Sequence, residues 1–74
     1  MTNYIEMSQY YSNDRNKRAD VVRSVGDPNN RVYGVRFNVD EHNLGIEWYE
    51  GKSESWAESA AENWVMGIKE TPNF

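Results

Sequence analysis

Four segments of the chain alternate hydrophobic and polar residues with a period of two, the pattern of a β-strand that buries one face. They span residues 3–11, 17–25, 31–39 and 44–50. The third shows the pattern most clearly, because one of its sides carries only Tyr33, Val35, Phe37 and Val39. Short polar segments separate the four, which predicts that consecutive strands pair side by side as an antiparallel meander.

Two of these assignments stay open at the level of sequence. In residues 17–25 the β-branched Val21, Val22 and Val25 favour a strand, but Ala19, Val22 and Val25 also fall at helical spacing. We favour the strand. The pattern also does not say whether residues 3–11 join the sheet, so we expect three or four strands.

The last periodic segment, residues 54–67, is predicted to be an α-helix. Its hydrophobic stripe consists of Trp56, Ala57, Ala60, Ala61, Trp64, Val65 and Ile68. Ser53 or Ser55 can cap its start, and Ser55 with Glu58 has the form of a capping box. Gly67 is placed to end the helix in a left-handed conformation, with Ile68 folding back as the accompanying hydrophobic contact.

Together these elements predict one small α+β domain over residues 1–74, an antiparallel β-meander of three or four strands packed on one C-terminal α-helix. Small alanines allow the helix to lie close to the sheet, and Trp64 is expected to be buried between them. The residues expected on the outer face of the sheet are Val32, Gly34, Arg36, Glu47 and Tyr49.

Composition excludes several classes of protein. The chain has 74 residues, a net charge of −4 and no cysteine, so disulfides, thiolate metal sites and cysteine nucleophiles are absent. We expect a reducing compartment. No run approaches the ~20 apolar residues of a membrane-spanning helix, and the first residues lack the pattern of a secretory signal. We therefore expect no membrane association.

The search for catalytic chemistry finds little. His42 is the sole histidine, and it follows Asp40 and Glu41 in a predicted turn. A single histidine without a second ligand at a suitable spacing makes a poor metal site, and the scattered glycines form no phosphate-binding loop. We therefore predict no enzyme activity, no catalytic residue, no metal and no cofactor.

Charge is distributed unevenly and suggests a binding surface. Residues 1–38 contain six basic and four acidic residues, whereas residues 39–74 contain two basic and eight acidic ones. Glu54, Glu58 and Glu62 follow one edge of the predicted helix about 6 Å apart, close to the spacing of backbone phosphates. Such an edge can occupy a basic groove of a nucleic-acid-handling protein; the alternative is an ordinary solvated helix face.

Further contacts are expected from the outer face of the sheet. Arg36 and Tyr49 are candidate anchors there, because arginine and tyrosine are enriched at the centres of protein interfaces. An edge strand could instead pair with a second copy of the chain, which would make the protein a homodimer or a structural component.

RNA binding is a further alternative. Residues 31–37 place arginines between aromatics, as in strands that stack RNA bases. If the face of Tyr33 and Phe37 were open, they would form a stacking platform with Trp48 and Arg36. The acidic balance of the chain makes binding to nucleic acid an unfavourable interpretation.

The segment from Glu50 to Lys69 resembles the carboxyl-terminal helix of short uncharacterised proteins of tailed phages of cyanobacteria, in which a serine-capped "AE..AENWV.GI" helix follows a strand. The resemblance covers about 20 residues and implies a phage source. It implies a fold more than a function, and it carries no activity and no set of functional residues. Given a phage source and the acidic helix edge, our leading hypothesis is an accessory protein that binds a host protein in the host cytoplasm.

Overall fold

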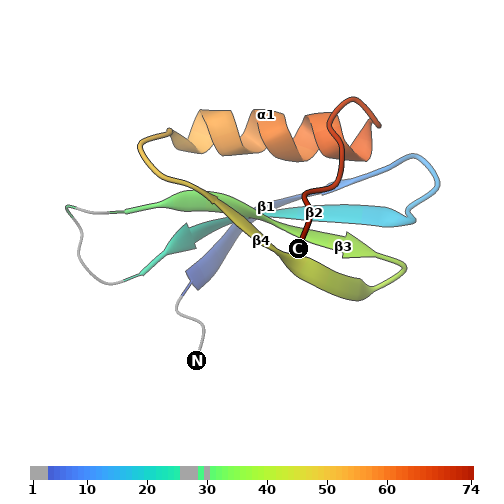
Figure 1. Ribbon diagram of the computed structural model, residues 1–74, viewed down its shortest axis with the longest axis horizontal. Helices are drawn as coiled ribbons and strands as arrows, with labels where there is room; N and C mark the ends of the chain where they lie inside the picture. Colours follow the sequence, from blue (N-terminus) through green and yellow to red (C-terminus); the bar gives the residue numbers. More distant parts are fainter. Residues whose placement is uncertain (1–3, 26–28, 30) are drawn as a thin grey trace.

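The computed structural model describes residues 4–25, 29 and 31–74. Its elements are, in chain order, β1 (Tyr4–Tyr11), β2 (Lys17–Ser24), β3 (Tyr33–Val39), β4 (His42–Tyr49) and α1 (Glu54–Val65). The strands form one antiparallel sheet in the order β1-β2-β3-β4, and α1 covers one face of it (Figure 1). The predicted α+β meander is therefore confirmed with four strands. Residues 17–24 are a strand, as favoured, and the polar segment expected between the second and third strands, residues 26–30, lies mostly outside the described residues.

The hydrophobic core lies between α1 and the sheet. The sheet contributes four fully buried side chains and the helix another four at most 6% exposed, namely Ala19, Val21, Val35 and Phe37 with Ala57, Ala60, Ala61 and Trp64. The Trp64 ring meets Phe37 edge to face, with centroids 4.8 Å apart. Trp64 is buried, as predicted, whereas Trp56 from the same predicted stripe stays 45% exposed.

Both ends of α1 are capped, although not in every predicted detail. The Ser53 hydroxyl accepts a hydrogen bond from the Trp56 backbone N–H at 3.2 Å, so Ser53 is the N-cap and the capping box predicted at Ser55 does not form. Gly67 has φ 83°, and the Ile68 N–H donates to the Asn63 carbonyl at 2.8 Å, which confirms the left-handed C-cap. Ile68 is 67% exposed and is not among the residues packed against the core, although it lines a shallow pocket with Trp56 and Ala60.

The turn between β3 and β4 is tighter than the predicted four residues. Asp40 and Glu41 have φ values of 50° and 70°, the left-handed pair typical of a two-residue type I′ hairpin turn, so β4 begins at His42. The register then shifts, because Phe37 is opposite Gly45 while Asn38 is opposite Asn43. Leu44 is the extra residue of this irregularity.

This register overturns one prediction about β4. Glu47 lies opposite Val35 and Tyr49 opposite Tyr33, so both are on the face that α1 covers and not on the outer face with Arg36. Ile46 and Trp48 take the outer positions instead. The physical reason is the extra residue Leu44, which exchanges the two faces of the strand beyond it. Gly34 permits the arrangement, since a Cβ atom there would come within 2.9 Å of the Trp48 ring and 2.6 Å of the Glu47 carbonyl.

β1 also carries an irregularity. Glu6 is opposite Val22 and Ser8 opposite Val21, so Met7 is an extra residue in β1. The strict alternation predicted for this strand therefore breaks at Met7: Tyr4 and Glu6 share the outer face with Gln9 and Tyr11.

Among the described residues, no helix covers the outer face of the sheet, and this face still buries side chains. Val22 and Asp20 are fully buried there. Tyr4 from β1 and Trp48 from β4 meet edge to face above them, with ring centroids 6.3 Å apart. The sheet thus has a thin second layer of side chains on the face opposite α1.

The segment after α1 folds back over the β4 side of the sheet (Figure 1). The Trp64 indole N–H donates to the Thr71 hydroxyl at 2.9 Å, and Lys69 forms an ion pair with Glu47 at 3.3 Å. The Phe74 ring lies 6.0 Å from that of Phe37. This packing was not predicted, because residues 69–74 have no periodic pattern.

Candidate protein-binding surface

Glu54, Glu58 and Glu62, which we call the acidic row, lie on the flank of α1 that faces β1. The opposite flank is fixed by Trp56, whose ring packs edge to face on Tyr49 of β4 at 4.7 Å. Since successive helical residues turn by 100°, the three glutamates lie on the side away from β4. Val65 lies on the same side of the helix as the glutamates, and it lines a groove together with Tyr11 at the end of β1.

The carboxylates of the acidic row form no ion pair with the rest of the described chain. Glu62 is exposed and the other two are half-buried. No described cation lies within ion-pair distance of any of them. Glu54 stands in the first turn of α1, where the helix dipole favours a negative charge. The other two lack that support, and like charges at i, i+4 repel by a few tenths of a kcal/mol.

A groove of about 410 Å³ lies at the carboxyl end of the row. We call it the turn groove; its lining residues are Tyr11, Ser12, Asn13, Asp14, Val65 and Met66. Glu62 precedes Val65 and Met66 by three and four residues, so it borders the groove on the helix surface. Met66 is 64% exposed.

Asp14 adds a fourth carboxylate. It accepts hydrogen bonds from the Asn16 backbone N–H at 3.0 Å and from the Ser12 hydroxyl at 2.7 Å, which hold its pKa below the usual value. It is therefore ionised at neutral pH. A groove with an ionised carboxylate and the hydrophobic side chains of Val65 and Met66 suits the aliphatic stem and the charged end of a lysine or arginine side chain.

Arg36, a predicted anchor, lies on the other side of the molecule. Its side chain is 17% exposed on the outer face of the sheet. Its guanidinium donates to Asp20 at 2.8 Å and to the Tyr4 hydroxyl at 2.8 Å, and it pairs with Glu6. Partial burial alone would lower the pKa of Arg36, but the hydrogen bonds to Asp20 and Tyr4 outweigh it and raise the pKa. The Arg36 side chain therefore bonds within the protein and is not a free anchor for a partner.

Tyr49, the second predicted anchor, belongs to the packing below α1. Its hydroxyl donates to the Glu47 carboxylate at 2.7 Å, and its ring packs on Trp56. Burial, followed by the hydrogen bond to Glu47, raises the pKa of Tyr49. The structure therefore does not bring Arg36 or Tyr49 together with the acidic row.

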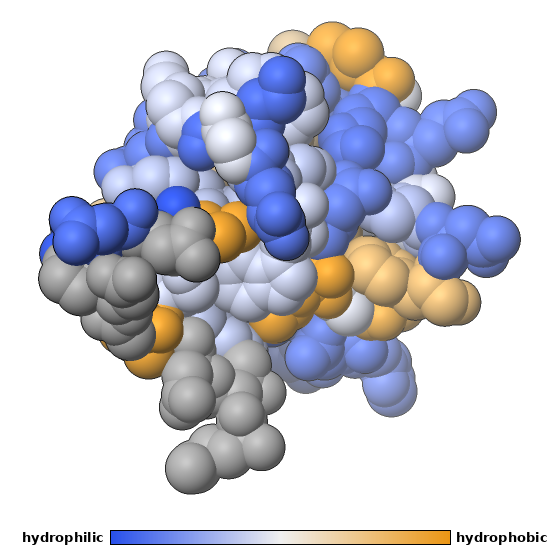
Figure 2. Space-filling model, turned by 60° about the vertical axis from the view of Figure 1, so that its left-hand side comes forward, coloured by the Kyte–Doolittle hydropathy of each residue, from blue (hydrophilic) through white to orange (hydrophobic). Residues whose placement is uncertain are grey.

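The stacking platform considered for RNA does not form. Tyr33 and Phe37 face α1, as their pattern predicts, while Trp48 and Arg36 lie on the opposite face. In the view of Figure 2, exposed hydrophobic side chains form separate patches among hydrophilic ones. The turn groove was missed by sequence reasoning; its one local signal is the polar turn after β1, which gives no indication that the end of α1 lies beside it.

The described part of the chain contains no cluster of side chains that could form a metal site. Within residues 4–25, 29 and 31–74, no three histidine or acidic side chains come together in a way that could hold a metal ion. His42 is exposed at the start of β4. The one described helix is too short to cross a membrane.

Comparison with known proteins gives no relative: no family model matches the chain, and no curated protein or solved structure is significantly similar to it.

Proposed function

We propose that this chain is a small phage-encoded accessory protein that acts without catalysis, by binding a basic surface of a host protein in the host cytoplasm. The observation that carries the proposal is the acidic row, three aligned carboxylates without a cationic partner among the described residues. The row ends at the turn groove with the ionised Asp14. The phage source rests on the resemblance of the segment that forms α1.

The geometry favours a partner with regularly spaced lysine or arginine residues. Carboxylates one helical turn apart are separated by about 6 Å, and alternate residues of an extended strand by about 6.7 Å. Basic side chains on either a helix or a strand can therefore match the row one by one. A partner that normally binds nucleic acid presents such a surface, and the row would occupy the place of its phosphates.

A matched pair of charge reversals tests this function. The variant Glu58→Lys/Glu62→Lys alters the row, and Glu50→Lys/Glu70→Lys makes the same change in net charge at exposed positions outside it. Glu54 is left unchanged because it supports the start of α1. Each tagged protein is used to capture partners from nuclease-treated cyanobacterial lysate, and retained proteins are identified by mass spectrometry.

We expect one host protein to be retained by the wild type and by the control variant, to be lost with the row variant, and to elute as salt rises. Equal retention by both variants would remove the acidic row from the proposal. An empty wild-type capture would argue against a host partner altogether.

A second candidate, self-association, is favoured by the edge of the sheet. No described strand pairs with the outer edge of β1, and Ile5 and Met7 on that strand are 40% and 37% exposed. Pairing of β1 with its copy would extend the sheet across a two-fold axis. Light scattering over a concentration series tests this: a stable oligomer at micromolar concentration would favour it over the host-binding function.

A further inference from the structure

A pocket of about 250 Å³ lies at the end of the sheet where the β1–β2 and β3–β4 turns meet. Its lining residues are Tyr11, Arg15, Asn16, Arg18, Asn38 and Glu41. It is separate from the turn groove, which lies beside α1, although Tyr11 borders both. The proposed host-binding function makes no use of this pocket.

The walls of the pocket are held by the fold. Tyr11, Arg18 and Asn38 are direct cross-strand neighbours on β1, β2 and β3, and they form one row on the outer face. The Asp40 N–H donates to the Asn16 carbonyl at 2.8 Å, which ties the two turns together. The residues that line the pocket therefore come from elements that are fixed relative to one another.

Two guanidinium groups reach this pocket with unused hydrogen-bonding capacity. Arg18 places its Nε 3.1 Å from Asp20 and donates a hydrogen bond of 3.4 Å to it from Nη2, which leaves Nη1 without a described partner; the same fully buried carboxylate is shared with Arg36 at 2.7 Å. One carboxylate thus serves two cations. Arg15 lies over the Tyr11 ring at 5.5 Å, and no described carboxylate is within ion-pair distance of it.

The other side of the pocket accepts hydrogen bonds. The Asn38 side-chain nitrogen is occupied by bonds to the Arg18 carbonyl and to Asp20, both at 3.1 Å, which leaves its oxygen as an acceptor. Glu41 is exposed and has no ion pair within the described part of the chain. A ligand here therefore meets two cations on one side and two acceptors on the other.

We infer that this pocket binds a phosphomonoester whose small organic part carries hydroxyl groups. Guanidinium groups match the oxygens of a phosphate dianion through charge-assisted hydrogen bonds. The hydroxyl groups would donate to Asn38 and Glu41. A volume of about 250 Å³ is just below the usual range of small-molecule sites, which fits a ligand the size of a sugar phosphate.

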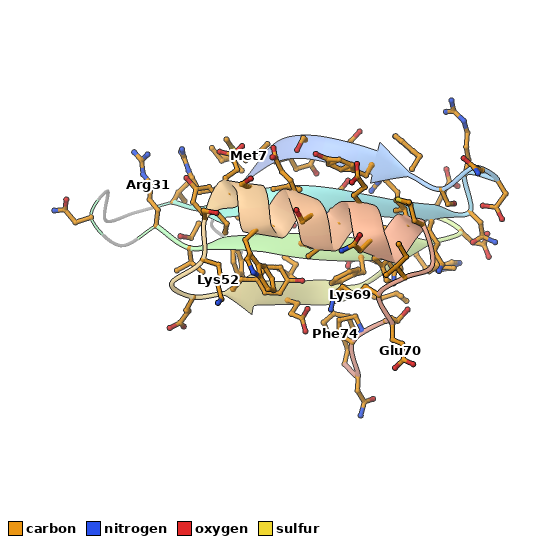
Figure 3. The ribbon with its side chains drawn as sticks, turned by 90° about the horizontal axis from the view of Figure 1, so that it is seen from above. Met7, Arg31, Lys52, Lys69, Glu70 and Phe74 are labelled. Carbon is orange, nitrogen blue, oxygen red and sulfur yellow. The ribbon has the colours of Figure 1, made fainter. Side chains whose placement is uncertain are left out.

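The test is a titration of isotope-labelled protein followed by backbone amide chemical shifts. The probes are ribose 5-phosphate, inorganic phosphate and ribose. Because the same group ends some nucleic acids, a trinucleotide with and without a 5′-phosphate is added as a second pair. Arg15→Gln removes one guanidinium, and Arg31→Gln is the control, since Arg31 is exposed at the opposite end of the molecule (Figure 3).

We expect shifts centred on residues 11–18 and 38–41, with ribose 5-phosphate binding more tightly than phosphate and ribose not binding. Arg15→Gln should weaken binding roughly tenfold or more and Arg31→Gln should leave it unchanged. Tighter binding of the phosphorylated trinucleotide than of its counterpart would also support the site and extend it to nucleic-acid ends. Shifts spread over all arginines, equal binding by Arg15→Gln, or no shift with any phosphate would overturn the inference. None of these outcomes depends on the acidic row.

Discussion

Tyr49 is a residue type that is common in protein interfaces, but in this structure it packs between the sheet and α1. Its ring lies between the sheet and Trp56, and its hydroxyl is bonded to Glu47. The extra residue Leu44 sets the face of Tyr49, and Gly34 accommodates the result, because a Cβ atom there would come within 2.9 Å of the Trp48 ring on the outer face. A close approach of this kind depends on which residues face each other across strands, and a single strand's pattern does not contain that information.

The raised pKa of Tyr49 predicts a loss of stability at alkaline pH. An unfolded tyrosine ionises near pH 10.0, and the folded protein holds Tyr49 protonated above that value. The unfolded state therefore loses this proton first, so the stability that Tyr49 contributes is present below about pH 10 and declines as the pH rises further. Urea unfolding at about pH 8 and about pH 11 should show a smaller alkaline loss for Tyr49→Phe than for the wild type.

The exposed Tyr11, which is 48% accessible, provides the control. Tyr11→Phe should lose stability between the two pH values as the wild type does. An alkaline loss that Tyr49→Phe leaves unchanged would mean that Tyr49 is not the group that titrates.

At the scale of elements, α1 and the strands follow from hydrophobic periodicity, but the faces of β1 and β4 do not. Each of these strands contains one extra residue, Met7 in β1 and Leu44 in β4. Both residues are hydrophobic and fit the alternating pattern of their strand, so the sequence gives no sign that either is an extra residue. An insertion of one residue exchanges the two faces of everything beyond it. This is why the strands were predictable, while the composition of the outer face and of the pocket at its end was not.

The two tryptophans of α1 give a prediction at this scale. Trp64 is fully buried against Phe37, so Trp64→Ala should reduce the free energy of unfolding by about 3–5 kcal/mol. Trp56 is 45% exposed and is the matched control, with a smaller expected loss from its contacts with Tyr49 and Lys52. Chemical denaturation of both variants measures the difference. Equal losses would show that α1 packs on the sheet with another face.

At the scale of the whole molecule, charge is organised in two systems that respond differently to salt. The carboxylates of the acidic row have no described cationic partner, so the partner binding that we propose for the row should weaken as ions screen them. The network around Asp20 lies within the second layer of the sheet, where one fully buried carboxylate contacts Arg18, Arg36 and Asn38. It links β2 to β3, and through Glu6 and Tyr4 to β1. The acidic row is the system that we propose for recognition, and the Asp20 network holds the sheet together on the face opposite α1.

Asp20→Asn tests the second system. The change keeps the shape of the side chain but leaves two partly buried guanidinium groups without their shared carboxylate, which should cost about 3–5 kcal/mol. A domain of this size has a free energy of unfolding of about 4–11 kcal/mol, so much of the stability should disappear. Glu6→Gln is the control, because Glu6 is 42% exposed at the edge of the same network and its loss should cost far less.

Repeating the urea unfolding in about 1 M salt, where screening acts within about 3 Å, should leave the Asp20→Asn deficit in place. A deficit that salt erases would place the Asp20 network in contact with solvent, and the outer face would then be an open charged surface instead of a second packed layer.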